Sequence, residues 1–327
     1  MGSQPSTVDY DSKGLELYQA ASRSPNFLPD IGIDESLVKY SGTDSSTVLE
    51  DYSTQLKVAK VPGYIDRLGS ILGPKTRAPN AVGLGALVIS MIMEMVFTST
   101  QTSENSYSMI QRIFGEEKAS RVRDTMLEYV KRHKMFMDNQ QALLKELGRL
   151  EKKLSNQLTT LRNSLLYDGE IKTRGFKIWV NGAAFHVQML IHEARLGAGK
   201  ASSNLTNPIK VAISEYLQDL DKLLDKYKTY MISNTFVVDI KQCSSRGCSN
   251  TIWQLRQKHD PNRRAHIPSK PDESWLDPDL IKSYANAVFS NYKPLTNLKT
   301  HFINIQDNLD ELIKQHHIFS LPSEDNV

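Results

Sequence analysis

Apolar residues recur at helical spacing over most of this chain, whereas the alternation typical of strands is almost confined to one short stretch. Proline and glycine signals separate the helical stretches, which cover residues 46–71, 107–166, 176–196, 208–230 and 278–317. The pattern predicts a mainly α protein: an elongated helical bundle with one fully apolar helix and at most a small β-hairpin.

The longest helical stretch, residues 107–166, contains no proline. A single helix of that length would extend roughly 90 Å, an upper bound because Gly115 or Gly148 could break it. Its leucines step by four and three, close to a heptad seam. We expect this association seam to be buried against another helix, in the same chain or in a partner; its members are Leu147, Leu150, Leu154 and Leu161.

Composition divides the chain into three regions. Residues 1–45 are rich in Ser, Asp, Gly and Pro, which predicts a flexible N-terminal arm. Residues 46–235 form the predicted bundle, including an apolar segment at 81–98. Residues 236–327 are expected to form a C-terminal loop and a helix that packs on the bundle.

The best strand candidate is Thr235–Ile240, which could form a hairpin with the cysteine loop that follows it. Cys243 and Cys248 are the two cysteines of the chain. A small disulfide loop in an oxidising compartment and two free thiols in a reducing one are both compatible with this spacing. No further Cys or His pair stands nearby at zinc-ligand spacing, so we expect no metal site.

Residues 81–98 differ from the rest of the chain because every helical face would be apolar. The segment could be a buried core helix, a permanent membrane span, or a helix that is hidden in the soluble form and released into lipid. Its eight Leu, Ile, Val and Phe residues favour insertion by roughly −2 to −5 kcal/mol. Glu94, if charged near the bilayer centre, costs about +3 kcal/mol. The sum is close to zero, which favours conditional insertion.

We therefore treat this segment as a candidate membrane-insertion site, with Glu94 as its acid switch, since protonation would remove most of the desolvation cost of the carboxylate. The candidate residues are Val82, Leu84, Leu87, Ile89, Ile92, Glu94 and Phe97.

Charge gives no case for nucleic acid as a partner, because 40 Lys and Arg stand against 37 Asp and Glu. Residues 112–177 carry a local basic surplus, as do residues 241–270. Either surplus could be a solvated surface or a contact with anionic lipid.

A search for catalytic residues finds none, and no cofactor is expected. The stretch from Gly197 to Ser202 lacks the Ser or Thr that must follow the Lys of a phosphate-binding loop, and it follows a helix. His186 and His192 are six residues apart, which rotates one about 240° from the other on a helix, so they would not share a ligand. We expect a protein that is not an enzyme.

Three stretches resemble fish proteins known as cephalotoxin-like: Ser106–Met109, Gly115–Ala119 and Val180–Leu190. This resemblance implies a secreted or toxin-related protein. A long bundle with one hidden apolar helix also resembles, over roughly residues 46–235, the architecture of the α-helical pore-forming toxins of the haemolysin E type. That resemblance implies membrane insertion and assembly.

Two functions are weighed. The first is a membrane-active, pore-forming helical protein whose partners are a lipid membrane and copies of itself. The second is a helical scaffold or adaptor that associates through the leucine seam. The first thirty residues contain no apolar core of a signal peptide, so we expect either a cytoplasmic protein, associated or not with a membrane, or export by a non-classical route.

Overall fold

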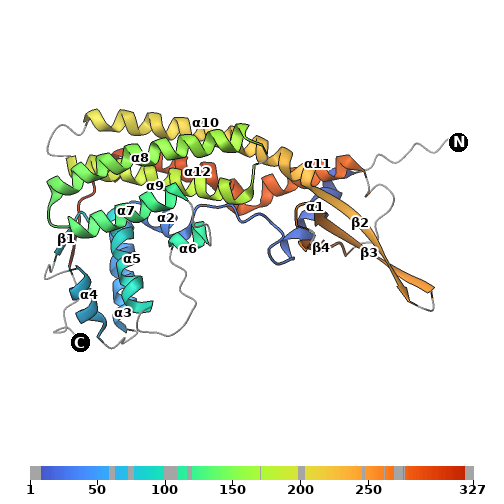
Figure 1. The fold of residues 1–327 in the computed structure, drawn as a ribbon, viewed down its shortest axis with the longest axis horizontal. Coiled ribbons are helices and arrows are strands. Elements are labelled where there is room, and N and C mark those ends of the chain that lie inside the picture. Colours follow the sequence, from blue (N-terminus) through green and yellow to red (C-terminus); the bar gives the residue numbers. More distant parts are fainter. Residues whose placement is uncertain are drawn as a thin grey trace.

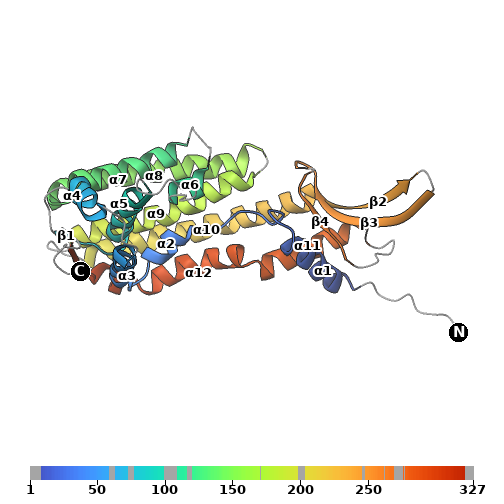
Figure 2. The same cartoon turned by 90° about the horizontal axis from the view of Figure 1, so that it is seen from below.

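A computed structural model describes residues 9–58, 63–72, 77–98, 109–115, 120–169, 171–197, 203–244, 247–260, 262–268, 275 and 277–320. The molecule is mainly helical and elongated, with small antiparallel sheets (Figures 1 and 2). Its long axis follows four helices: α8 (Gln140–Tyr167), α9 (Thr173–Gly197), α10 (Ser203–Asn234) and α12 (Lys293–Asp307).

Helix α9 lies at the centre of this bundle, packed against α8, α10 and α7 (Arg121–Met135). Its side chains are buried on almost every face, including the large rings of Phe176, Trp179 and Phe185. A helix that is covered on all sides loses the polar stripe of a surface helix, which explains why its sequence shows a wide apolar face.

The stretch over residues 107–166 does not reach its 60-residue upper bound, because the chain breaks twice before α8: near Gly115, as the sequence allows, and between α7 and α8. Helix α6 (Met109–Phe114) ends at Gly115, whose φ of +51° is a left-handed conformation that favours glycine. Helices α7 and α8 each begin with a polar cap: Ser120 accepts from the Arg123 amide, and Asn139 accepts from the Ala142 amide. These N-caps begin new helices at positions that the apolar pattern alone does not mark.

A layer of shorter helices lies across one end of the long bundle, and most of it is seen below α7 at the left of Figure 1. It consists of α2 (Glu35–Tyr40), α3 (Ser45–Val58), α4 (Tyr64–Leu72) and α5 (Leu84–Thr98). The chain enters α5 through β1 (Arg77–Pro79), which pairs antiparallel with β5 (Ile318–Ser320) near the other end of the sequence.

The opposite end carries α1 (Tyr10–Ser22), α11 (Pro278–Asn291) and a three-stranded sheet (Figures 1 and 2). The expected flexible arm is wrong for residues 9–45, because α1 packs tightly on α11 and buries Leu17 and Ala21. At Gly14 a Cβ would stand 2.5 Å from the Ser283 carbonyl carbon, so the two backbones approach more closely than any side chain allows.

The sheet has the order β2–β3–β4, with β2 (Thr235–Ser244) and β3 (Gly247–Gln257) forming a long antiparallel hairpin and β4 (Arg264–His266) at the edge. The predicted hairpin is thus present and longer than the sequence pattern indicated. Its register places Cys243 opposite Cys248, while the side chains of residues 242–251 lie outside the described set.

The last predicted helical stretch, to about residue 317 and with a bend allowed at Pro294, forms three helices: α11, α12 and α13 (Leu309–Lys314). Tyr292 ends α11 in an extended conformation, and Pro294 lies in the first turn of α12, where a missing N–H costs nothing.

Candidate functional site

Helix α5, which contains most of the candidate insertion residues, is buried among other helices. Val82, Leu84, Leu87, Ile89 and Ile92 are each at most 3% exposed. The side chain of Phe97 lies outside the described set. Because residues 84–93 of α5 are buried on every face, their apolarity serves the packing of this fold.

Two kinds of helix cover α5. The short helices α2, α3 and α4 pack on it, and on another side it contacts α7 and α9 of the long bundle. Within the part of the chain that the structure describes, no helix combines the length and the apolarity needed to cross a bilayer.

Glu94 is half-buried in the C-terminal half of α5. Burial raises the pKa of its carboxyl, and Asp34 and Glu35 act in the same direction, while Arg112 and Lys39 oppose them. The Arg112 guanidinium donates two hydrogen bonds to the Asp34 carboxylate, from Nε at 2.7 Å and from Nη2 at 2.8 Å. The surroundings of Glu94 are therefore a mixed set of charges at the edge of an apolar layer.

The entry turn of α5 is held by the C-terminal segment. Besides the β1–β5 pairing, the Ala81 amide donates to the His317 carbonyl at 3.0 Å. Gly83 has a φ of +54°, and its amide donates to Ser45 Oγ at 2.8 Å. Gly83 and Gly85 therefore serve a tight turn, since a Cβ on Gly85 would stand 2.4 Å from the Asn80 carbonyl oxygen.

Arg195 of α9 links three segments that are far apart in the sequence. Its Nε donates to the Leu312 carbonyl at 2.6 Å, Nη1 to the Val82 carbonyl at 3.2 Å, and Nη2 to Gln315 Oε1 at 3.1 Å. The side chain is 1% exposed, and burial lowers its pKa to about 10, so it stays protonated at neutral pH. It ties the bundle to the turn before α5 and to α13.

Arg195 belongs to a buried group of four side chains, which we call the histidine cluster: Tyr129, His133, His192 and Arg195. Tyr129 Oη and His192 Nδ1 are hydrogen-bonded at 2.7 Å, and the two imidazole rings are 5.6 Å apart between centroids. In the described part of the chain, His133 Nδ1 and His192 Nε2 are buried without a hydrogen-bond partner. Orphaned buried nitrogens are rare in proteins and call for an explanation.

Both imidazoles are neutral at physiological pH. Burial lowers the pKa of His133 to about 4. The pKa of His192 is also lowered far below its ordinary value, by burial first and then by electrostatic interaction with His133 and with Arg195. Only part of this cluster could be predicted from the sequence. His192 and Arg195 share a helix face because they are three residues apart. Tyr129 and His133 lie on α7 and meet them only because α7 packs against α9.

The leucine seam is used inside this chain. Leu147, Leu150 and Leu154 are fully buried where α8 meets α9, α7 and α10, and Leu161 is partly buried. The described fold thus leaves no continuous leucine stripe on α8 for a partner.

His186 and His192 have separate partners, consistent with their helical spacing. His186 lies 2.9 Å from both Glu151 Oε1 and Tyr216 Oη. Among the described side chains no group of three His, Cys, Asp or Glu residues is arranged as a metal site.

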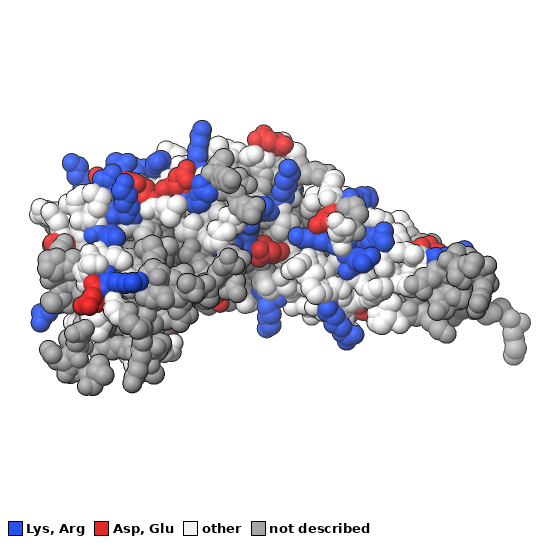
Figure 3. Space-filling model, turned by 60° about the horizontal axis from the view of Figure 1, so that its bottom comes forward, with Lys and Arg blue, Asp and Glu red and all other residues white. Residues whose placement is uncertain are grey.

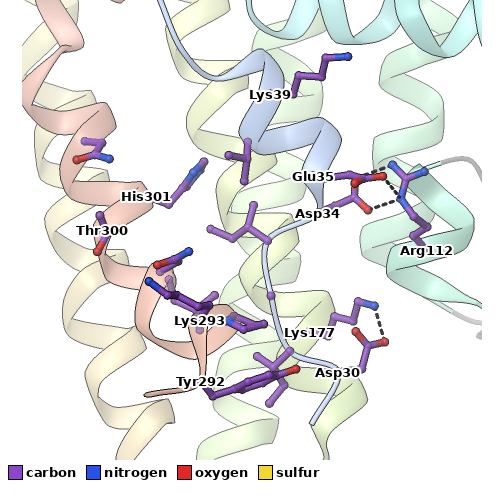
Figure 4. Close-up of a pocket in the computed structure, with 18 residues that line it drawn as sticks. Asp30, Asp34, Glu35, Lys39, Arg112, Lys177, Tyr292, Lys293, Thr300 and His301 are labelled. Carbon is purple, nitrogen blue, oxygen red and sulfur yellow. Dashed lines mark hydrogen bonds and ion pairs between the residues drawn. The ribbon is translucent and has the colours of Figure 1, made fainter. Parts of the chain in front are cut away.

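A surface groove of about 1140 Å³ lies between the segment before α2 and the first turns of α12 (Figure 4). The ion pairs Arg112–Asp34 and Lys177–Asp30 stand at one wall, and His301 and Lys293 stand on the opposite helix. Opposite charges are thus largely matched across its lining. The wider surface in Figure 3 likewise shows acidic side chains between the basic ones, so the local basic surplus does not form a single-sign face there.

Comparison with known proteins yields no match: no family model, no curated protein and no solved structure is significantly similar to this chain.

Proposed function

We propose that this protein is membrane-active: α5 leaves its cover among the helices and enters lipid, with release of vesicle contents as the outcome. The observation that carries the proposal is the position of α5, an apolar helix covered largely by the short helices α2, α3 and α4, at one end of the molecule. Displacing a short-helix layer disrupts less of the core than opening the long bundle would.

Length sets a condition on insertion. The 15 residues of α5 span roughly 22 Å as a helix, against about 30 Å of hydrocarbon. Extending the helix through the entry turn, to residues 81–98, brings it to roughly 27 Å. Insertion therefore requires the turn at Val82 and Gly83 to unfold from its contacts with Arg195 and Ser45.

Protonation of Glu94 changes the free energy of the inserted state. It is not what releases α5 from its covered state. Its pKa in the soluble fold is raised above the ordinary value, so its protonation stabilises the covered state at low pH, and that contribution is lost as pH rises. A neutral Glu94 nevertheless lowers the cost of placing α5 in hydrocarbon. Acid thus helps insertion through Glu94 without driving release.

The alternative, a scaffold that associates through the leucine seam, has less support because those leucines fill the core of this chain. A scaffold would need another surface.

The test mixes purified protein with vesicles of neutral or anionic lipid at about pH 5 and about pH 7.5, and measures flotation and dye release. We expect both at about pH 5. If the protein neither floats nor releases dye under any of these conditions, the membrane function is wrong and α5 is a core helix.

A pair of variants sharpens this test. Glu94→Gln removes the ionisable group of α5, so it should strengthen flotation and make it less dependent on pH. Glu193→Gln is the matched control, because burial also raises the pKa of Glu193, which lies on α9. Equal effects of the two substitutions would contradict insertion of α5.

A further inference from the structure

Two buried imidazoles stand directly beneath the entry of α5. His133 is 2% exposed and His192 is fully buried. His133 Nε2 lies 3.7 Å from the position that a Cβ on Gly85 would occupy, so the ring packs against the first turn of α5. Arg195, next to His192, holds the carbonyl of Val82 in the same turn.

We propose that His133 and His192 form an acid-sensitive latch, which keeps α5 in its covered position while both rings are neutral and releases its entry turn when they are protonated. This inference rests on the proposed function, because release of α5 is the step that membrane entry requires. It adds the chemical signal, acidification, and the residues that detect it.

Protonation of His133 or His192 is unfavourable in the covered state because none of the groups named below offers a negative charge to the ring. From α7 and α9, the groups facing the pair are Tyr129, which is neutral, and Arg195, which is already positive. The C-terminal segment contributes Gln315, an uncharged side chain bonded to Arg195. Two imidazolium ions here would join a buried guanidinium in a region of low dielectric, where like charges repel strongly.

Several carboxylates on the surrounding helices have other partners. The ionisable group of α5, Glu94, interacts with Arg112, Lys39, Asp34 and Glu35. On α8, which packs against α7 and α9, Glu146 contacts Arg149 and Arg132, and Glu151 contacts His186. In the C-terminal segment His317 contacts Glu50, and His316 contacts Asn80.

The direction of the pH effect follows from the histidine pKa values. A group whose pKa is depressed in the covered state stabilises that state fully above the ordinary pKa of 6.5, and the stabilisation is lost as pH falls toward the depressed value of about 4. Between about pH 7.5 and about pH 5, exposure of His133 alone should raise the open population of α5 about 30-fold. His192 adds to this in the same direction.

The test is amide hydrogen exchange of the full chain without lipid, read by mass spectrometry and corrected for the intrinsic pH dependence of exchange. We expect peptides from α5 to open more at about pH 5 than at about pH 7.5, by the roughly 30-fold gain from His133 less the opposing contribution of Glu94, while α10 stays protected. Equal opening of α5 at both pH values, or opening of α5 and α10 together as in global unfolding, overturns the latch.

Two variants remove the titrating group: His133→Phe, which keeps a ring in the space, and His133→Gln, which keeps a polar group. Either one that folds should lose most of the acid-induced opening of α5. His301→Phe is the control, because His301 is also buried with a pKa lowered to about 4 but lies on α12 beside the groove. If the His133 variants keep the acid response of the unmodified protein, the latch is wrong.

Vesicle flotation on the same proteins separates the latch from the membrane function. Acid-induced opening of α5 without flotation means that the latch stands and the membrane function fails. Flotation that is equal at both pH values and unaffected in the His133 variants means that the membrane function stands and the latch fails.

Discussion

At the scale of single residues, Arg195 is unusual because its buried guanidinium is held by carbonyl and amide oxygens, with no carboxylate partner among the described residues. Burying a charge in this way costs free energy that only good hydrogen bonds offset. Those bonds join α9 to the turn before α5 and to α13, so the residue sets how the ends of the bundle and the short-helix layer meet.

We expect Arg195→Met to lower the free energy of unfolding by about 2–4 kcal/mol. The substitution removes a buried charge, which is favourable, but it leaves the carbonyls of Val82 and Leu312 without a donor, and each orphaned group costs about 1–3 kcal/mol. Chemical denaturation measures the change, and proteolysis within residues 309–320 should become faster. A stability equal to that of the unmodified protein would mean that the desolvation cost of Arg195 cancels its bonds.

At the scale of elements, α8 shows how a regular leucine spacing becomes a packed interface. Its buried leucines face α9, and α7 and α10 close the sides. Across that interface, Arg162 of α8 bonds Asp219 of α10 at 2.7 Å, which fixes the two helices at the polar margin of the seam.

Leu154→Ala should cost about 2–5 kcal/mol of stability, because Leu154 is fully buried and its removal leaves a cavity. Leu161→Ala, on the same helix and in the same seam, is the matched control: Leu161 is only partly buried, so the loss should be clearly smaller. Denaturant midpoints of the two variants decide the matter. Equal midpoints for the two would show that burial does not differ along the seam in solution.

The hairpin β2–β3 brings its two cysteines into register, since Cys243 pairs with Cys248 across the ladder. The backbones of opposite residues in an antiparallel pair are about 4.5–5.5 Å apart between Cα atoms, which is within the span that a disulfide bridges. Under oxidising conditions we therefore expect an intramolecular disulfide, detected as a loss of two hydrogens by non-reducing mass spectrometry. Stoichiometric zinc in the purified protein would contradict this.

At the scale of the whole molecule, the long bundle and the short-helix layer are stabilised in different ways. The bundle buries apolar surface along its length through α8, α9, α10 and α12. Polar links join the layer at one end to the remainder; they include Arg195, the β1–β5 pairing and the bond from the Asp34 amide to Asn181 Oδ1. A layer held by few and partly titratable contacts is where local opening would begin.

Local patterns determined the mainly helical fold class, the hairpin and the segment that stands out as apolar, because periodicity and breaker residues act over short distances in the chain. They allowed a break near Gly115 but did not show the second one, between α7 and α8, because that break depends on the cap at Asn139, which does not alter the apolar period.

Tertiary structure alone decided that the leucine seam faces this chain's own helices, that residues 9–45 are packed, and that Tyr129, His133, His192 and Arg195 meet. These residues come from two helices that cross, and they serve a turn and a C-terminal segment distant in sequence. Charge and hydrogen bonding between such elements depend on which faces meet in space, which no period along the chain specifies.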